Sequence, residues 1–151
     1  NVRLYKKESN AVKLFLCFII FFASSAFSQT AVEITAASDL DSLETWKDLE
    51  NWRLKYAPKF YDGFYAEGVA DFVERQLAEN WQNFPLLISE TSKSPELFNF
   101  VTSHLGEITT CSNTKIILNN TKNNCPLKLA VYCNKIYKNL KLNASSGCVP
   151  I

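Results

Sequence analysis

The side chain best suited to acid–base chemistry near neutral pH is histidine, and this chain has one. His104 is the only histidine among the 151 residues, and Glu107 follows three positions later. A nucleophilic triad would also need a serine or cysteine beside the histidine and a third group to orient it. No Gly-x-Ser-x-Gly sequence marks such a serine. We therefore expect His104 to be a solvated residue at the end of a helix, without a catalytic role.

Three acids form a second candidate group. Glu67, Asp71 and Glu74 have the spacing of one helical face, and a pair of carboxylates there could support glycosidic chemistry. Asp71 also precedes Arg75 by four residues, which is the spacing of a surface ion pair. We expect the ion pair, and the sequence assigns no catalytic residue. An enzyme of an unrecognised kind that uses the acids of residues 67–74 remains the alternative.

Four of the five cysteines, Cys111, Cys125, Cys133 and Cys148, lie in the C-terminal part of the chain. Their spacings lack the close Cys-x2-Cys pairs of zinc modules. The chain also has no P-loop and no glycine-rich turn for a dinucleotide. We therefore expect no metal ion and no cofactor, and we expect these cysteines to form two disulfides.

The pairing of these cysteines follows from the helix expected between Cys111 and Cys125. Such a helix would separate them by about 21 Å, whereas a disulfide needs Cα atoms within about 7 Å. This excludes Cys111–Cys125 and, with it, Cys133–Cys148. Residues that face each other in an antiparallel hairpin have numbers with a nearly constant sum. Only the nested pairing, Cys111–Cys148 with Cys125–Cys133, meets that condition, and we predict it.

The first 28 residues have the parts of a secretory signal peptide. A basic lead is followed by an uncharged apolar run, Leu14 to Ala26, and by the small-x-small sequence Ala26-Phe27-Ser28. Val12 is an alternative opening of the same peptide, and we expect cleavage before Gln29. The run is shorter than the roughly 20 apolar residues that a membrane span needs. We therefore expect a secreted or periplasmic protein with no stable membrane insertion.

Residues 29–151, which we expect to form one domain, have two halves of opposite charge. Residues 29–108 carry 14 acids and 6 bases, whereas residues 109–151 carry six lysines and no acid. Only Tyr132 and Tyr137 are interleaved with these lysines, which is too few aromatic side chains for a nucleic-acid groove. We expect the halves to pack together mainly by apolar contact. Their opposite charges should help only modestly, because salt screens exposed charges over about 8 Å.

Apolar periodicity predicts an all-α fold. We expect about five helices, near residues 43–56, 62–81, 94–105, 110–122 and 129–140. Asp41 and Glu44 could cap the first, and Ser94-Pro95 could start the third. Residues 84–88 are ambiguous because of Pro85, and residues 31–35 favour a short strand. The last two helices should form a C-terminal hairpin stapled by the two disulfides.

These observations favour a small helical protein that binds another protein, with the architecture of an inhibitor or immunity protein, although fold alone does not assign function. A helical carrier of an apolar ligand is a further alternative. Trp46, Trp52 and Trp81 have helical spacing with other apolar residues, so we expect them in the core rather than in a ligand cage. Asn119 and Asn143 begin sequons that would accept a glycan in a eukaryotic secretory pathway.

Overall fold

The computed structural model describes residues 30–60, 62–106, 110–143 and 148. The predicted signal peptide, residues 1–28, lies outside these residues. The chain divides into two compact units after Ile34, and the packing described below is that of the second unit, from Thr35 onward.

The described residues contain seven α-helices, two short 3-10 turns and no strand, which confirms the all-α prediction. The expected number of about five helices was too low. The helices are α2 (Ala31–Asp41), α3 (Trp46–Tyr56), α4 (Gly63–Glu79), α5 (Phe84–Lys93), α6 (Pro95–Ser103), α7 (Cys111–Asn123) and α8 (Ala130–Asn143). The 3-10 turns are Trp81–Asn83 before α5 and Leu127–Leu129 before α8.

The strand expected at residues 31–35 is wrong, because these residues form the start of α2. Val32, Ile34 and Thr35 are β-branched, which favours a strand locally. The backbone N–H of Thr30, however, donates to Glu33 Oε2 at 2.6 Å, and the N–H of Glu33 donates to Thr30 Oγ1 at 3.3 Å. This reciprocal capping box satisfies two amide groups that would otherwise be free at a helix start.

The start of α3 also differs from the prediction. Its N-cap is Thr45, and Thr45 and Asp48 form the capping box that the sequence analysis assigned to Asp41 and Glu44. Ser94 precedes α6 as expected, but its side chain makes no cap hydrogen bond. The Ser94 hydroxyl instead accepts a hydrogen bond from Arg53 Nη2 at 3.2 Å. Ser94 therefore ties the α5–α6 junction to α3.

Arg53 also pairs with Glu50 on the same helix. Arg53 Nε and Nη2 donate to the two Glu50 carboxylate oxygens at 2.7 and 2.9 Å, and Glu50 is buried. Burial raises the pKa of Glu50, but hydrogen bonds from Arg53 and Ser94 and the charge of Arg53 outweigh this, so the pKa is lowered. The same pair raises the pKa of Arg53. Glu50 is therefore held as a buried carboxylate on α3.

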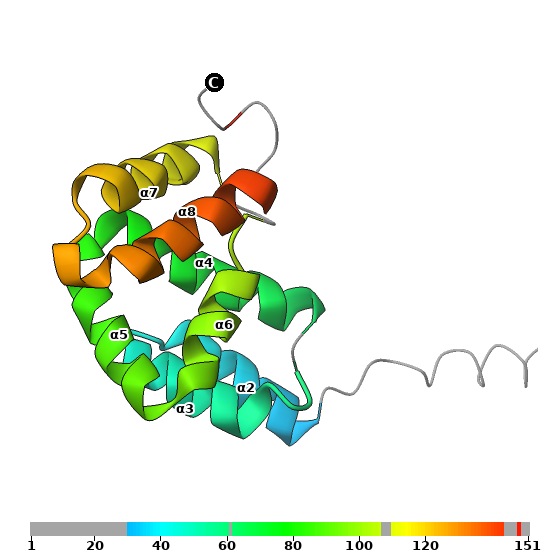
Figure 1. Cartoon of the computed structure of the whole chain (residues 1–151). Coiled ribbons are helices and arrows are strands. Elements are labelled where there is room, and N and C mark those ends of the chain that lie inside the picture. Colours follow the sequence, from blue (N-terminus) through cyan, green and yellow to red (C-terminus); the bar gives the residue numbers. More distant parts are fainter. Residues whose placement is uncertain (1–29, 61, 107–109, 144–147, 149–151) are drawn as a thin grey trace, which may run out of the picture. The chain divides into compact units, whose positions relative to one another are not determined.

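One hydrophobic core joins the two halves of the second unit. Trp46 and Phe72 meet edge to face at 5.6 Å in the acidic half, while Ile117, Ile136 and Leu140 contribute fully buried side chains from the basic half. Figure 1 shows α7 and α8 side by side, with α4 against α7, and these helix pairs make extensive contacts. The predicted packing of the two halves is thus an apolar one.

Gly68 of α4 lies against the side chain of Leu40 of α2. A Cβ atom built on Gly68 would lie 2.5 Å from a methyl carbon of Leu40, a distance that real side chains do not tolerate. Glycine is otherwise a weak helix former. Its absent side chain in fact lets Leu40, which is buried, pack directly on the α4 backbone.

Candidate functional site

A surface hollow of about 320 Å³ lies where the chain passes from α2 into α3. Its walls combine carboxylates, a lysine, amide and hydroxyl groups, and two aromatic rings. The lining residues are Asp39, Ser42, Leu43, Glu44, Asp48, Asn51, Trp52, Lys55 and Tyr56. We call this the α2–α3 hollow.

Asp39 is fixed in the wall of the α2–α3 hollow by two donors from α3. The Tyr56 hydroxyl donates to Asp39 Oδ2 at 2.6 Å, and Lys55 Nζ donates to the same oxygen at 3.1 Å. The hydrogen bond from Tyr56, followed by that from Lys55, lowers the pKa of Asp39. Hydrogen bonding to Tyr56 and to Asp39 raises the pKa of Lys55, whose ammonium lies 4.5 Å from the centre of the Tyr56 ring. Both groups therefore stay charged in place.

Asp48 is fixed by the capping box of α3. Its Oδ2 accepts from the Thr45 backbone N–H at 2.9 Å and from the Thr45 hydroxyl at 2.7 Å. The Thr45 side chain is the main reason that the pKa of Asp48 is lowered. Glu44 differs, because its side chain is exposed and no ion-pair partner reaches it from the residues that the structure describes. Glu44 is therefore the acid in the hollow that is free to bind a ligand.

The aromatic part of the α2–α3 hollow is equally rigid. Trp52 is buried, and its indole N–H donates to the backbone carbonyl of Ala36 at 2.9 Å. Tyr56 packs against Trp52 with ring centres 5.8 Å apart. Three carboxylates and one ammonium group line the hollow, a net charge of −2. The excess of carboxylates favours a positively charged ligand.

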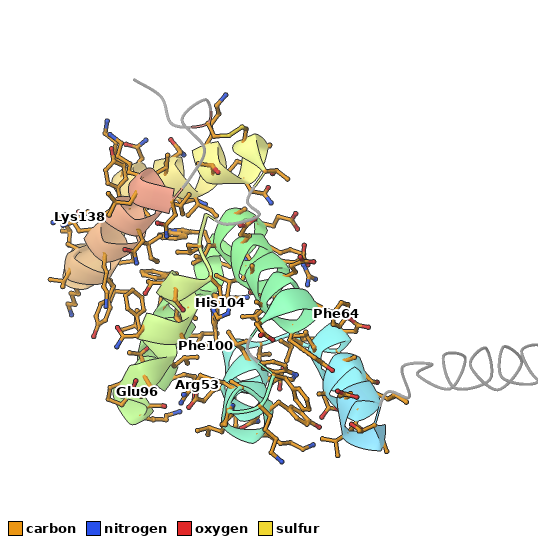
Figure 2. All side chains as sticks on the ribbon, turned by 90° about the vertical axis from the view of Figure 1, so that its right-hand side faces the viewer. Arg53, Phe64, Glu96, Phe100, His104 and Lys138 are labelled. Atoms are coloured by element: carbon orange, nitrogen blue, oxygen red, sulfur yellow. A yellow bond between two sulfur atoms is a disulfide. The ribbon has the colours of Figure 1, made fainter. Side chains whose placement is uncertain are left out.

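His104 lies at the end of α6, but the expectation that it is solvated is wrong. Its side chain is buried and packs on the Phe100 ring at 4.5 Å (Figure 2). Nδ1 lies 2.8 Å from the Phe100 carbonyl oxygen and therefore donates to it. Ser103 Oγ is 3.4 Å away. His104 thus has a structural contact that explains its position, with no carboxylate placed to orient it as a base among its described partners.

The three acids of α4 are not gathered into a site. Asp71 forms the expected ion pair with Arg75 at 3.5 Å, and both side chains are exposed. Glu67 is exposed as well, whereas Glu74 is buried. In the described part of the chain, no three side chains of histidine, cysteine, aspartate or glutamate are close enough together to hold a metal ion.

The four cysteines form two disulfides, Cys111–Cys148 and Cys125–Cys133, with Cα atoms 4.7 and 6.3 Å apart. This is the nested pairing that the sequence favours. The second bridge spans the turn between α7 and α8, which pack together. Of the sequon residues, Asn119 is exposed on α7, and Asn143 ends α8 with its amide donating to the Leu105 carbonyl at 3.1 Å.

Two of the three tryptophans are core residues, as expected. Trp46 and Trp52 are buried. Trp81 is half-buried and stacks on Phe84 at 4.6 Å, and its indole N–H donates to the Asn124 carbonyl at 3.0 Å. None of the three is arranged with the others as a ligand cage.

No protein-family model, curated protein or solved structure matches this chain. None of the helices in the described residues is long and apolar enough to span a bilayer.

The sequence did not predict the α2–α3 hollow, although Glu44 and Trp52 stood out as a cap candidate and a core residue. The Thr45-x-x-Asp48 capping pattern was readable and would have placed Asp48 at the start of a helix. The contact of Asp39 with Tyr56 was not readable, because the two residues are 17 positions apart and meet only through the turn between α2 and α3.

Proposed function

We propose that this chain is a protein-binding module of a secretory or periplasmic compartment, and that the α2–α3 hollow receives a cationic side chain of its partner. In this proposal residues 1–28 are a cleaved signal peptide and residues 29–151 a single helical domain. The two disulfides are consistent with an oxidising compartment. The observation that carries the proposal is the arrangement of three carboxylates in the hollow. Asp39 and Asp48 are held by hydrogen bonds, and Glu44 has no ion pair among the described residues.

The rigidity of the hollow supports binding, because a site that is already ordered loses little entropy when it binds. Asp39 and Asp48 are held by hydrogen bonds to α3 residues and the Thr45 cap, so a cation meets oriented acceptors. Tryptophan, tyrosine and charged residues in desolvated pockets supply much of the energy of protein interfaces. The hollow would hold one long basic side chain, and the partner would cover the surrounding surface.

Glu44 is the position at which to test this proposal. Its carboxylate is exposed and has no ion pair in the structure, so changing it should leave the fold intact. Glu44→Lys reverses the charge in the hollow. Glu67→Lys is the matched control, because it reverses the charge of an exposed acid on α4 that does not line the hollow.

The experiment is affinity capture from the secretory or periplasmic fraction of the native host, with quantitative mass spectrometry for wild type and both variants. We expect a specific partner that Glu67→Lys retains and that Glu44→Lys loses at least about tenfold, because truncating or reversing a charge that the interface buries costs about 2 kcal/mol or more. Thermal unfolding must show that Glu44→Lys is folded. Equal capture by wild type and Glu44→Lys would show that the hollow is not the binding site.

A further inference from the structure

The outer face of α8 carries the most exposed large apolar side chains in the described part of the chain. Leu127, in the 3-10 turn before α8, is 95% exposed, and Val131 and Leu142 are 79% and 81% exposed. The opposite face of α8 is in the core, where Ile136 and Leu140 are fully buried. These three apolar side chains therefore have no role in the packing of the fold.

Two lysines lie between Val131 and Leu142 on the same face of α8. At 3.6 residues per turn, Val131, Lys135, Lys138 and Leu142 fall within an arc of about 60°. They line one shallow groove of about 450 Å³ together with Asn134 and Asn139. Figure 2 shows Lys138 at the outer edge of the α7–α8 pair, directed away from the remaining helices. The face thus has an apolar residue at each end and positive charge between them.

None of the lysines in the basic half forms an ion pair with another residue that the structure describes. Residues 109–151 contain six lysines, no acid and no arginine. Lys115, Lys122 and Lys141 line a second hollow, of about 360 Å³, between α7 and α8. All ion pairs found in the described residues lie in the acidic half. Lys135 Nζ donates to Asn99 Oδ1 at 2.7 Å and lies 5.4 Å from the centre of the Phe98 ring, so both of its described partners are uncharged.

We propose that this face, Leu127 to Leu142, adsorbs to the surface of a bilayer that contains anionic phospholipids. The lysine ammonium groups would contact lipid phosphates, while their alkyl stems and the three exposed aliphatic side chains enter the headgroup layer. Since the apolar face of α8 is already buried in the protein, adsorption is peripheral. This proposal does not depend on the α2–α3 hollow.

The composition of the face favours lipid over a protein partner. Protein interfaces are enriched in arginine and aromatic residues and depleted in lysine, whereas this face has lysines and isolated aliphatic residues. A soluble polyanion such as a sulfated glycan or a nucleic acid would bind the lysines but would make no apolar contact with Leu127, Val131 and Leu142. A surface with both anionic groups and an apolar layer accommodates the whole set.

The test is flotation of the exported, disulfide-bonded protein with vesicles of phosphatidylcholine containing about one quarter phosphatidylglycerol. We expect binding that weakens with salt and that is absent with pure phosphatidylcholine vesicles. Lys135→Gln/Lys138→Gln should weaken binding about 25-fold, since each lysine near an anionic surface contributes about fivefold. Val131→Ser/Leu142→Ser should weaken it about tenfold, because the inserted methyl groups are lost.

Lys47→Gln/Lys59→Gln is the matched control, because it removes two exposed lysines from the acidic half. Binding by this control within about twofold of wild type would support the α8 face as the site. The proposal is wrong if the protein does not float with anionic vesicles, or if the control loses as much binding as Lys135→Gln/Lys138→Gln. It is also wrong if the lysine pair matters, the aliphatic pair does not, and heparin binds equally well, since the face would then bind a soluble polyanion.

Discussion

The acidic and basic halves of the second unit are both built from packed helices, but they are stabilised by different means. The acidic half, residues 35–106, is rich in aromatic contacts such as Trp46 on Phe72 and Trp81 on Phe84. The basic half, residues 110–143 and 148, has two tyrosines and two disulfides. Where large rings are scarce, covalent links reduce the entropy of the unfolded chain instead.

The seam between the halves shows which interactions join them. Asn120 donates to the Leu77 carbonyl at the end of α4 at 3.1 Å, Asn143 donates to Leu105, and Trp81 donates to Asn124. No ion pair between the halves is found in the described residues. The common core and hydrogen bonds from side-chain N–H groups to backbone carbonyls therefore join the halves, and no described ion pair does.

The largest effect is expected from removing a ring of the acidic half. Phe72 is 1% exposed, so Phe72→Ala should lower the free energy of unfolding by about 3–5 kcal/mol. Phe64→Ala is the matched control on the same helix, because Phe64 is 58% exposed and its loss should change stability by no more than about 0.5 kcal/mol. Urea unfolding followed by tryptophan fluorescence and by circular dichroism measures both variants.

The two probes also test whether the halves are one cooperative unit. All three tryptophans lie in the acidic half, whereas circular dichroism reports on every helix. Because the core is continuous, both signals should change at the same urea concentration in Phe72→Ala. If the tryptophan fluorescence changes at low urea while about half of the helical circular dichroism signal remains, the basic half folds by itself.

The basic half should respond instead to removal of its disulfides. The bridges span 37 and 8 residues, so Cys111→Ser/Cys148→Ser should cost about 4 kcal/mol and Cys125→Ser/Cys133→Ser about 2.5 kcal/mol on the chain-entropy model. Urea unfolding of the oxidised protein and the two double variants measures this difference. If removing either disulfide lowers the free energy of unfolding by the same amount, loop length does not determine how much each disulfide stabilises the protein.

The pairing itself can be checked by tryptic digestion without reduction, because lysines separate all four cysteines. We expect linked peptides for Cys111–Cys148 and Cys125–Cys133. A peptide that links Cys111 to Cys133 would contradict the structure. If all four cysteines of the exported protein are free thiols, disulfides do not stabilise the basic half.

Most of the fold was predictable from sequence because helix periodicity and disulfide geometry are local or nearly so. The spacing of Val69, Phe72, Val73 and Leu77 identifies the buried face of α4 directly. The errors lie where a local preference competes with a specific contact. Residues 31–35 have strand-forming side chains, but the Thr30–Glu33 capping box favours helix.

Burial and the candidate site were harder to predict, because both depend on contacts between distant residues. His104 is polar and ends a helix, which suggests exposure, yet the neighbouring turns bury it against Phe100. The α2–α3 hollow requires the turn that brings Asp39 to Tyr56. Nothing in the sequence around Asp39 fixes the angle of that turn.

The smallest predicted effect compares one threonine cap in each half. Thr45 begins α3 and Thr110 begins α7, and each hydroxyl accepts from the backbone N–H three residues later, at 3.2 and 3.1 Å. At neutral pH, Thr45→Ala and Thr110→Ala should each lower the free energy of unfolding by about 1 kcal/mol. The caps differ in one respect: the third residue is Asp48 in α3 and the uncharged Asn113 in α7.

This difference predicts that only the Thr45 cap responds to acid. The Thr45 side chain lowers the pKa of Asp48 from its usual 3.8, so this interaction stabilises the protein above that pH and is lost as pH falls through the lowered pKa. The stability gap between wild type and Thr45→Ala should therefore shrink in acid, whereas the gap for Thr110→Ala should stay constant. Urea unfolding of the three proteins from neutral pH to below the pKa of Asp48 measures both gaps. If the Thr110→Ala gap also shrinks, acid weakens caps in general, and the carboxylate of the acidic half has no special part in holding α3.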